Sequence, residues 1–236
     1  MRERSHSLAL ASPWNAAKHW EYWVNRGPAS VLLADDHVLV RQGLRSLLDR
    51  EKIKVIAEAS DGQEAIHLVE AHHPEVAVID ISMPTLNGVD AARQLPRSCP
   101  KTRVILLTQH EEEQYLHEAL QSGVRGYVLK SQVVNDLIHA IQRVSRGGFY
   151  LSPGVSQAVV EAYRSRSGRP SDPLSSRERQ VLQLIAEGKS TKDVASLLRI
   201  SVKTAESHRS GIMKKLDIHE TASLVRYAVR RGLVQP

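Results

Sequence analysis

The sequence feature that most constrains the fold is a regular alternation of short apolar runs with amphipathic stretches, from residue 30 to about residue 146. Each apolar run has the length of a buried strand, and each stretch after it has the periodicity of a helix with one apolar face. Five such repeats predict an α/β domain, a five-stranded parallel sheet covered by helices on both faces. The runs are Val31–Ala34, Ile53–Ala57, Val76–Ile79, Arg103–Leu107 and Arg125–Leu129, and the stretches are Val38–Arg50, Asp61–His72, Gly88–Leu95, Glu111–Ser122 and Val133–Arg146.

The chain after the last repeat is organised differently. Residues 149–173 are rich in turn and linker residues, with one short helix expected over Val155–Tyr163. The segment 174–236 shows helical periodicity only, so the sequence predicts a domain of residues 30–148, a linker and a second, all-α domain. Four short helices are expected in that second domain, with start signals at Ser175-x-x-Glu178, Ser190-x-x-Asp193 and Ser201, and the last helix over Glu220–Arg231.

Composition limits the remaining classes. No apolar run approaches the roughly 18–20 residues of a membrane span, so we expect a cytoplasmic protein without a membrane partner. The single cysteine, Cys99, excludes an internal disulfide and a cysteine-based zinc site. Residues 1–29 contain all three tryptophans and fit neither domain. We expect them to form a poorly ordered extension, with an aromatic docking face as the alternative.

The net charge of +6 is unevenly distributed along the chain. Residues 30–148 contain 13 Lys and Arg against 16 Asp and Glu, whereas residues 174–236 contain 12 against 6. This asymmetry favours a polyanion as the partner of the C-terminal segment. A basic surface without any partner is the alternative.

Chemistry-bearing side chains follow four of the predicted strands. The first strand is followed by Asp35 and Asp36, the third by Asp80, the fourth by Thr108 and the fifth by Lys130. Carboxyl ends of parallel strands lie at one edge of a sheet, so these side chains should converge. Three carboxylates at one point repel one another unless a cation is bound, and Mg2+ prefers oxygen ligands. One carboxylate of such a site can act as a nucleophile and form an aspartyl phosphate.

These residues and their surroundings resemble the receiver domain of bacterial response regulators over roughly residues 30–148. The resemblance rests on D-D-H at 35–37, V-I-D-I-S-M-P-T-L-N-G at 78–88, L-L-T at 106–108 and G-Y-V-L-K at 126–130. It implies a flavodoxin-like strand order of 2-1-3-4-5. It implies that Asp80 accepts phosphate from a sensor histidine kinase and that Asp35, Asp36, Asp80 and the Ser82 carbonyl are Mg2+ ligands. It implies that Lys130 pairs with the phosphoryl group and that Thr108 and Tyr127 are switch residues. Pro84 and Gly88 are implied to shape the loop after Asp80.

An enzyme is the main alternative for such a site. Haloacid-dehalogenase-like phosphatases also place an aspartate nucleophile at a strand end, but they need a second Asp two residues later as general acid. That position is Ser82 in this chain. We therefore expect no enzyme, and we expect no organic cofactor. His37 belongs to the D-D-H motif, and we assign it no metal.

The segment Leu174–Leu216 resembles the LuxR-type helix-turn-helix, so the whole chain resembles a NarL/FixJ-type response regulator. Thr191–Leu198 is then the positioning helix and Val202–Leu216 the recognition helix, which enters the major groove of double-stranded DNA. The last helix, Glu220–Arg231, is expected to form a homodimer contact that recognises a two-fold site. Glu206, Ser207 and Ser210 are expected to face base edges, and Lys203, Thr204, Arg209 and Lys214 to hold phosphates.

Three positions depart from the family pattern: a larger β-branched residue is usual at Ala205, Asn is common at Gly211, and Gly commonly ends the helix at Asp217. Glycine inside a helix costs about 1 kcal/mol relative to alanine, so these changes concern the stability of the recognition helix. The sequence predicts a DNA-binding transcriptional regulator controlled by phosphorylation of Asp80, with RNA polymerase as a further candidate partner. The alternative is a phosphorylation-independent regulator that uses the receiver only as a dimerisation scaffold.

Overall fold

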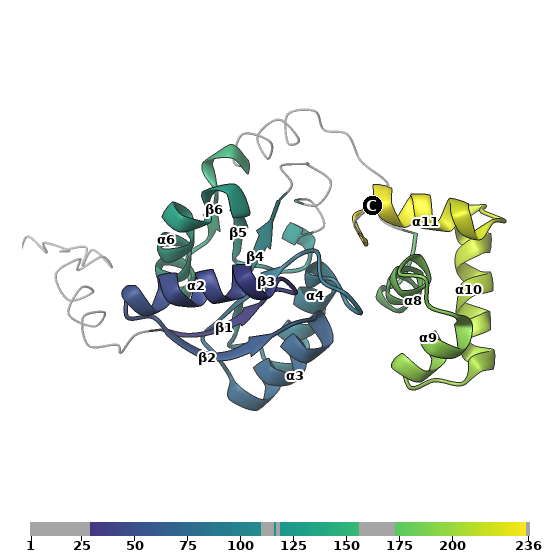
Figure 1. Cartoon of the computed structure of the whole chain (residues 1–236), viewed down its shortest axis with the longest axis horizontal. Helices are drawn as coiled ribbons and strands as arrows, with labels where there is room; N and C mark the ends of the chain where they lie inside the picture. Colours follow the sequence, from purple (N-terminus) through teal and green to yellow (C-terminus); the bar gives the residue numbers. More distant parts are fainter. Residues whose placement is uncertain (1–28, 110–115, 117–118, 156–172, 235–236) are drawn as a thin grey trace, which may run out of the picture.

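A parallel β-sheet forms the centre of the N-terminal domain (Figure 1). The structure is a computed structural model of the chain, and it describes residues 29–109, 116, 119–155 and 173–234. All five pairs of neighbouring strands are parallel. The order across the sheet is β2 (Lys54–Ala59), β1 (Ser30–Ala34), β3 (Val76–Asp80), β4 (Arg103–Thr108), β5 (Gly126–Leu129) and β6 (Tyr150–Leu151).

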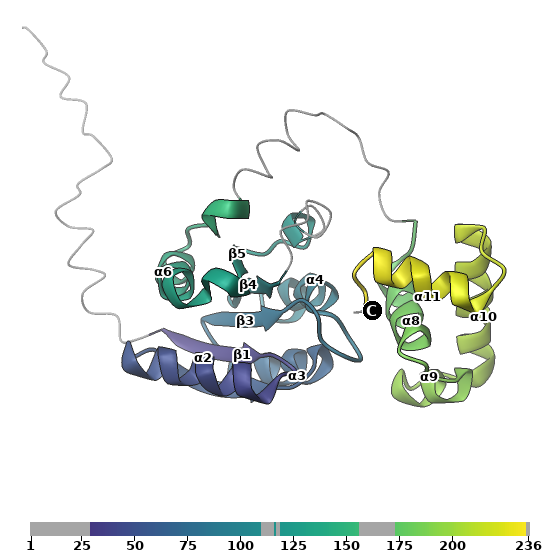
Figure 2. The ribbon, with the colours of Figure 1, turned by 45° about the horizontal axis from the view of Figure 1, so that its top comes forward.

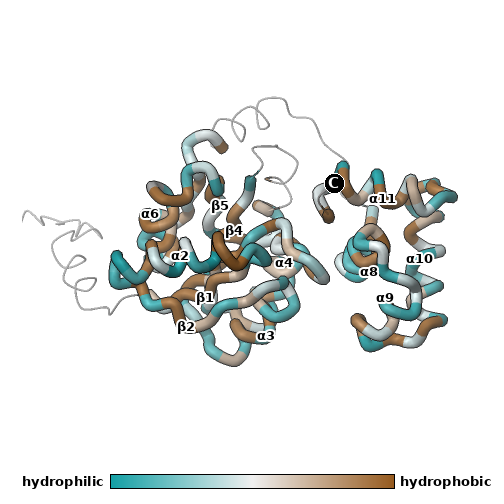
Figure 3. The backbone as a smooth tube through the Cα atoms, viewed as in Figure 1, coloured by the Kyte–Doolittle hydropathy of each residue, from teal (hydrophilic) through white to brown (hydrophobic). Residues whose placement is uncertain are grey.

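Helices cover both faces of this sheet (Figure 2). On one face, α3 (Gly62–His72) and α4 (Gly88–Ser98) pack against Leu32, Ile79 and Leu106. On the other face, α2 (Val38–Arg50) and α6 (Val133–Ser145) pack against the alternate residues of the same strands, which include Leu33 and Val78. Because successive strand residues point to opposite faces, a strand buried on both sides must be apolar throughout. Figure 3 shows this as largely brown strands between helices of mixed colour.

The sheet has one strand more than the sequence predicted. The expected order 2-1-3-4-5 is confirmed for the first five strands, and β6 extends it at the edge next to β5. Gly147, at φ +83°, ends α6 and reverses the chain. The Tyr150 N–H then donates to the carbonyl of Arg125, and the Ser152 N–H to that of Tyr127. A two-residue strand is too short to produce a hydrophobic pattern, so this segment was predicted as linker.

Other predicted elements differ from the structure in smaller ways. Helix α4 continues through Pro96 to Ser98, beyond the predicted end of this stretch at Leu95, and Cys99 behind it is buried. The predicted helix Glu111–Ser122 lies largely outside the described residues, with Leu116 and residues 119–121 in helical conformation. Residues 1–28 and most of the predicted helix Val155–Tyr163 also lie outside them.

The C-terminal domain consists of four helices, as the sequence predicted: α8 (Ser176–Ala186), α9 (Thr191–Leu197), α10 (Val202–Leu216) and α11 (Thr221–Arg230). Both predicted capping boxes are present, at Ser175 and Ser190, and Ser201 caps α10. The four helices bury a core of their own that includes Leu182, Ile212 and Leu224. In the described part of the chain, no helix is long and apolar enough to cross a membrane.

Candidate functional site

The carboxyl ends of β1 and β3 bring three acidic side chains together. Asp80 is the last residue of β3, and Asp35 and Asp36 follow the adjacent strand β1 directly. The side chains of Asp35 and Asp80 are almost completely buried, whereas that of Asp36 is about one-third exposed (0%, 2% and 32%). Oxygen atoms of the three carboxylates and a ring nitrogen of His37 lie within 4.8 Å of one another. The predicted convergence of Asp35, Asp36 and Asp80 is therefore present.

Lys130 lies between two of these carboxylates. It begins a 3-10 turn, η1 (Lys130–Gln132), immediately after β5. Its Nζ atom is 2.7 Å from Asp35 Oδ2 and 2.9 Å from Asp80 Oδ2. Burial alone would lower the pKa of Lys130, but the negative charges of Asp80 and Asp35 outweigh it and raise that pKa. The ammonium group is thus held in its charged form.

Asp80 remains in an environment with excess negative charge. Burial raises the pKa of its carboxyl group, and the nearby charge of Asp35 raises it further. The ammonium of Lys130 and the backbone N–H of Ser82 act in the opposite direction but do not cancel these effects. One lysine therefore does not neutralise the carboxylates that meet here, and the site has capacity for a further cation.

The loop between Asp80 and α4 is tightly packed against the end of β3. A Cβ atom on Gly88 would lie 2.1 Å from the carbonyl oxygen of Asp80, so only glycine fits at this position. The Gly88 N–H donates to the carbonyl of Ile81 and closes the loop. Thr85, within the loop, has φ +67°, a left-handed conformation that is unfavourable for a β-branched residue.

The two predicted switch residues occupy neighbouring strands. Thr108 ends β4, whose residue Leu107 pairs with Asp80, so Thr108 lies at the same edge of the sheet as the carboxylates. Tyr127 lies in β5 and is buried in the core on the α3 and α4 side. The structure thus places Thr108 at the site edge and Tyr127 in the adjacent core.

Two residues near the carboxylates were not assigned a role from the sequence. The backbone N–H of His37 donates to Asp35 Oδ1 at 2.9 Å, and its ring Nδ1 lies 2.8 Å from Asp36 Oδ1. Arg41, one turn into α2, donates from Nη1 to the backbone carbonyl of Asp35 at 2.5 Å. The only indication of them in the sequence is that both follow the acidic pair closely, His37 directly and Arg41 at the end of the first turn of α2.

The residues present fit a hard divalent cation. The donor set is three carboxylates from two adjacent strand ends, two of them buried and only partly neutralised by Lys130. Mg2+ prefers such oxygen ligands and keeps several waters, so part of its coordination sphere would stay open to another ligand.

In the helical domain, the predicted DNA-contacting face of α10 is exposed. Lys203, Glu206, Ser207, Ser210 and Lys214 are all solvent-exposed, whereas Ala205 and Ile212 on the opposite face are buried. The two remaining predicted contacts have partners within the domain. Arg209 donates to Thr221 Oγ1 at 2.7 Å, and the hydroxyl of Thr204, which is exposed, lies 2.7 Å from Ser201 Oγ.

Helix α10 is fixed to α8 by an ion pair that the sequence did not indicate. Lys215 Nζ lies 2.6 Å from Glu178 Oε2, and the same carboxylate accepts hydrogen bonds from the backbone and side chain of Ser175. Burial alone would raise the pKa of Glu178, but Lys215 and Ser175 together lower it. The carboxylate that caps α8 thus also positions α10.

Of the three departures from the family pattern, Asp217 and Ala205 have a structural explanation and Gly211 has none. Asp217 ends α10 in the left-handed conformation, at φ 53°, which explains why glycine is common there and why a short polar residue is tolerated. At Gly211 an added Cβ would lie 3.7 Å from Glu178 Oε1, an ordinary contact, so nothing in the packing requires glycine. Ala205 is buried and fills its position against the core.

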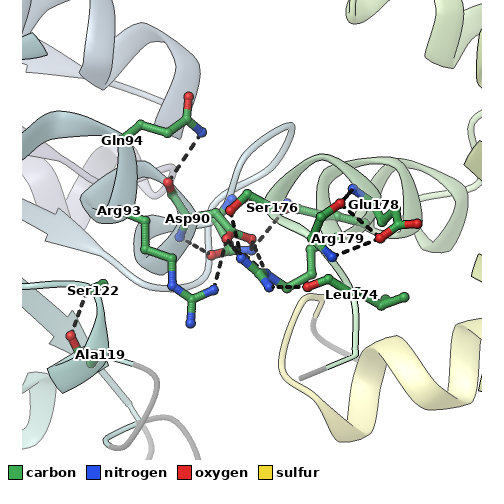
Figure 4. A network of polar contacts seen from close by, with 12 residues as sticks. Asp90, Arg93, Gln94, Ala119, Ser122, Leu174, Ser176, Glu178 and Arg179 are labelled. Carbon is green, nitrogen blue, oxygen red and sulfur yellow. Dashed lines mark hydrogen bonds and ion pairs between the residues drawn. The ribbon is translucent and has the colours of Figure 1, made fainter. Parts of the chain in front are cut away.

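Polar contacts connect the two domains, and sequence reasoning missed them (Figure 4). Arg179 of α8 donates to both carboxylate oxygens of Asp90 in α4, from Nη2 at 2.7 Å and from Nε at 3.0 and 3.2 Å. Asp90 and Arg179 are both buried. The available signal is a polar stripe on α8, in which Arg179, Gln183 and Glu187 follow one another at intervals of four residues. Helix α10 lies on the other side of α8 from the sheet domain (Figures 1 and 2).

Comparisons with known proteins define the class of both domains. Residues 31–142 match the family described as response regulator receiver domain, and residues 172–228 match that described as bacterial regulatory proteins, luxR family. A receiver joined to a LuxR-type DNA-binding domain is the architecture of a two-component response regulator that regulates transcription.

Full-length relatives share this architecture. The transcriptional regulatory protein MctR of Rhizobium johnstonii is 38% identical over 205 residues, covering 86% of this chain and 94% of the relative. The oxygen regulatory protein NreC of Staphylococcus carnosus is 36% identical over 213 residues, covering 86% and 98%. The solved structure of the RcsB response regulator of Salmonella typhimurium is 28% identical, with a TM-score of 0.55 over 87% of this chain and all of that one. The chain belongs to the NarL/FixJ-type two-component response regulators.

A solved complex also bears on the helical domain. The structure of the RcsB–DNA complex is 29% identical to this chain, with a TM-score of 0.54, covering 85% of this chain and 97% of that one.

Proposed function

We propose that Asp80 is the phosphoacceptor of this response regulator and that a sensor histidine kinase is its phosphodonor. The observation that carries the proposal is the convergence of three carboxylates within 4.8 Å, with Lys130 Nζ 2.9 Å from Asp80. A buried carboxylate that retains excess negative charge is suited to bind a cation and then a phosphoryl group. Membership of the family supports the same assignment.

The chemistry is a displacement at phosphorus. A carboxylate oxygen of Asp80 attacks the phosphorus of a phosphohistidine, a P–O bond forms, the P–N bond breaks, and the imidazole nitrogen keeps the bonding electron pair. The ammonium of Lys130 balances negative charge on the phosphoryl oxygens. Asp35, Asp36, Asp80 and the carbonyl of Ser82 are the proposed ligands of Mg2+. When bound, this ion supplies electrostatic stabilisation of the transferred group.

Exposed apolar side chains beside the acidic site suit a protein phosphodonor. Val38 and Leu39 begin α2 one residue after the acidic pair and are 53% and 83% exposed. Val134, the second residue of α6, follows Lys130 closely and is 66% exposed. Apolar side chains that flank a reactive group from two elements favour contact with another protein over solvent alone.

Phosphorylation acts through Thr108 and Tyr127 in this proposal. The hydroxyl of Thr108 moves toward the phosphoryl oxygens, and Tyr127 changes rotamer in step. The surface around β5 then changes and favours a homodimer. A dimer presents two copies of α10 to a two-fold DNA site, where Glu206, Ser207 and Ser210 face bases and Lys203, Thr204, Arg209 and Lys214 hold phosphates. RNA polymerase is a further proposed partner of the DNA-bound form.

Labelling with acetyl phosphate and Mg2+ tests the phosphoacceptor. Asp80→Ala should abolish labelling, because the attacking carboxylate is lost. Asp49→Asn is the matched control, since the Asp49 side chain is exposed on α2 away from the site. Persistent labelling of Asp80→Ala would disprove the assignment.

Salt-dependent DNA binding tests the recognition helix. Lys203→Ala should weaken binding to all DNA sequences and reduce the salt slope by about 1, as expected for loss of one phosphate contact. Lys54→Ala, at an exposed lysine of β2, is the control. Equal DNA affinity with and without a beryllofluoride phosphoryl mimic would instead favour the phosphorylation-independent regulator.

A further inference from the structure

The loop that follows Asp80 adopts a conformation that its own sequence disfavours. Thr85 has φ +67°, and a β-branched side chain in the left-handed region crowds its own backbone. Ser82, whose carbonyl is a proposed Mg2+ ligand and whose N–H donates to Asp80, lies three residues earlier in this loop. Besides the hydrogen bonds within the loop, contacts from outside it can offset the unfavourable conformation of Thr85.

Those contacts come from the DNA-binding domain. Gln183 of α8 is completely buried; its Oε1 accepts from the Asn87 N–H at 3.0 Å, and its Nε2 donates to the Met83 carbonyl at 2.9 Å. Glu187, which caps the C-terminal end of α8, accepts from the N–H of Thr85 at 3.1 Å. Two side chains of α8 and its C-cap thus bind three backbone groups of the loop, one at Thr85 and one on each side of it.

The Asp90–Arg179 pair fixes the register of this contact. Asp90 also accepts from Asn87 Nδ2 at 3.1 Å, so the ion pair and the loop contact share one network. Arg179 Nη1 donates to the carbonyl of Leu174 at the beginning of the same domain. This geometry holds α8 so that Gln183 and Glu187 face the loop.

The contact between the domains is polar and therefore suited to form and break. Among the described residues, no hydrophobic cluster contains side chains from both domains. Interfaces of this kind allow domain motion, whereas a shared apolar core would not. The loop conformation can consequently differ between docked and undocked forms.

We propose that Gln183 and Glu187 are positioning residues for the phosphoacceptor site: by bracing the strained loop at Thr85, the DNA-binding domain maintains the conformation that binds Mg2+ and phosphate. The proposal rests on the proposed function of Asp80. Because coupling between sites is reciprocal, Mg2+ bound at the carboxylates favours docking of α8 to the same extent that docking favours Mg2+.

A double-mutant comparison in the full-length protein tests this. Gln183→Leu removes the hydrogen bonds of Gln183 to Met83 and Asn87, and we expect a fivefold or greater loss of Mg2+ affinity by titration calorimetry, with slower labelling by acetyl phosphate. Hydrogen exchange of the loop amides around Thr85 should accelerate in the same variant. Adding Thr85→Gly relieves the strain without the brace, so Mg2+ affinity in the double variant should return to within about twofold of wild type.

Glu187→Ala provides a second route if Gln183→Leu does not fold, with the same direction of change. Arg177→Ala is the matched control on α8, because Arg177 bonds Gln180 and the Leu198 carbonyl within its own domain. Unchanged or tighter Mg2+ binding in the brace variants would overturn the proposal. An equal loss in the Thr85→Gly background would also overturn it, because the effect would then not pass through the loop strain.

Failure of the proposed function gives a different result. If Asp80 is not the phosphoacceptor, Asp80→Ala is still labelled whatever the state of the brace. If only the brace proposal is wrong, wild type is labelled at Asp80 and the Gln183 and Glu187 variants match it in labelling, Mg2+ affinity and hydrogen exchange.

Discussion

Two buried aspartates, Asp80 and Asp90, lie ten positions apart and have opposite electrostatic surroundings. Asp80 shares one ammonium with Asp35 and has Asp36 nearby, so negative charge is in excess and its pKa is raised, chiefly by burial. Asp90 receives a bidentate guanidinium from Arg179. Burial alone therefore does not make a carboxylate reactive. Its negative charge must also be incompletely neutralised by nearby cations. One aspartate is suited to bind a cation and a phosphoryl group, and the other holds two domains together.

The largest effect is expected from removing Arg179, the cation that binds Asp90 from the other domain. Arg179→Ala removes the guanidinium that joins Asp90 to the other domain and leaves buried Asp90 with Arg93 at 3.3 Å and Asn87 at 3.1 Å, which should disfavour the docked arrangement by about 1.5–3 kcal/mol. Small-angle X-ray scattering should then show a larger radius of gyration. In the double variant Asp90→Asn with Arg179→Ala the buried negative charge is removed together with its interdomain partner, so the expansion should be smaller. An unchanged radius in the single variant would contradict the role given to this pair.

Neutralising each aspartate should change stability in opposite directions. Asp80→Asn removes one of several like charges and should stabilise the protein by roughly 0.5–2 kcal/mol, as is common where a functional site is destabilised. Asp90→Asn weakens the bond to Arg179 and should destabilise the docked form. Urea unfolding without Mg2+ measures both. Changes of the same sign would remove the distinction between the two sites.

Acid should lower the stability of the helical domain through protonation of Glu178. Its folded-state pKa is lowered, despite burial, by Lys215 and Ser175, so its stabilising contribution is present above its ordinary pKa of 4.5 and is lost as the pH falls through the lower folded-state value. Glu178→Gln should cost about 1 kcal/mol at pH 7, similar to loss of a helix cap, and the cost should shrink in acid. Thermal unfolding of both forms between pH 7 and pH 3 measures this. A cost independent of pH would contradict the assignment.

The smallest effect is expected at Gly211, beside the same carboxylate. Gly211→Ala should stabilise α10 by about 0.5–1 kcal/mol, because a methyl group there meets Glu178 Oε1 only at 3.7 Å. Circular dichroism during thermal unfolding measures the gain. Destabilisation would mean that the ion pair of Glu178 with Lys215 does not tolerate the added contact.

Much of the fold could be predicted because its signals are local. The apolar runs and caps such as Ser175 report on neighbouring residues, and parallel pairing alone then brings Asp35 and Asp80 to one edge. The two-residue strand β6 could not be predicted, because its existence depends on the reversal at Gly147 and on an open sheet edge. The short helical end of α4 beyond Pro96 was missed for a similar reason, since proline only biases a helix toward its end.

By itself, the sequence determined how strands and helices alternate along the chain and which acidic residues meet at the sheet edge, because apolar runs and the ends of parallel strands follow from local pattern. The strand order across the sheet was implied by the resemblance to receiver domains. Only the tertiary structure decided which buried carboxylate is neutralised. Besides Arg93 in the same helix, Asp90 receives a second cation from Arg179, 89 positions away, and the bonds that hold Thr85 in its unfavourable conformation come from Gln183 and Glu187 in the other domain. No local pattern encodes such partners, because charge balance in a buried site depends on what the docked domains place around it.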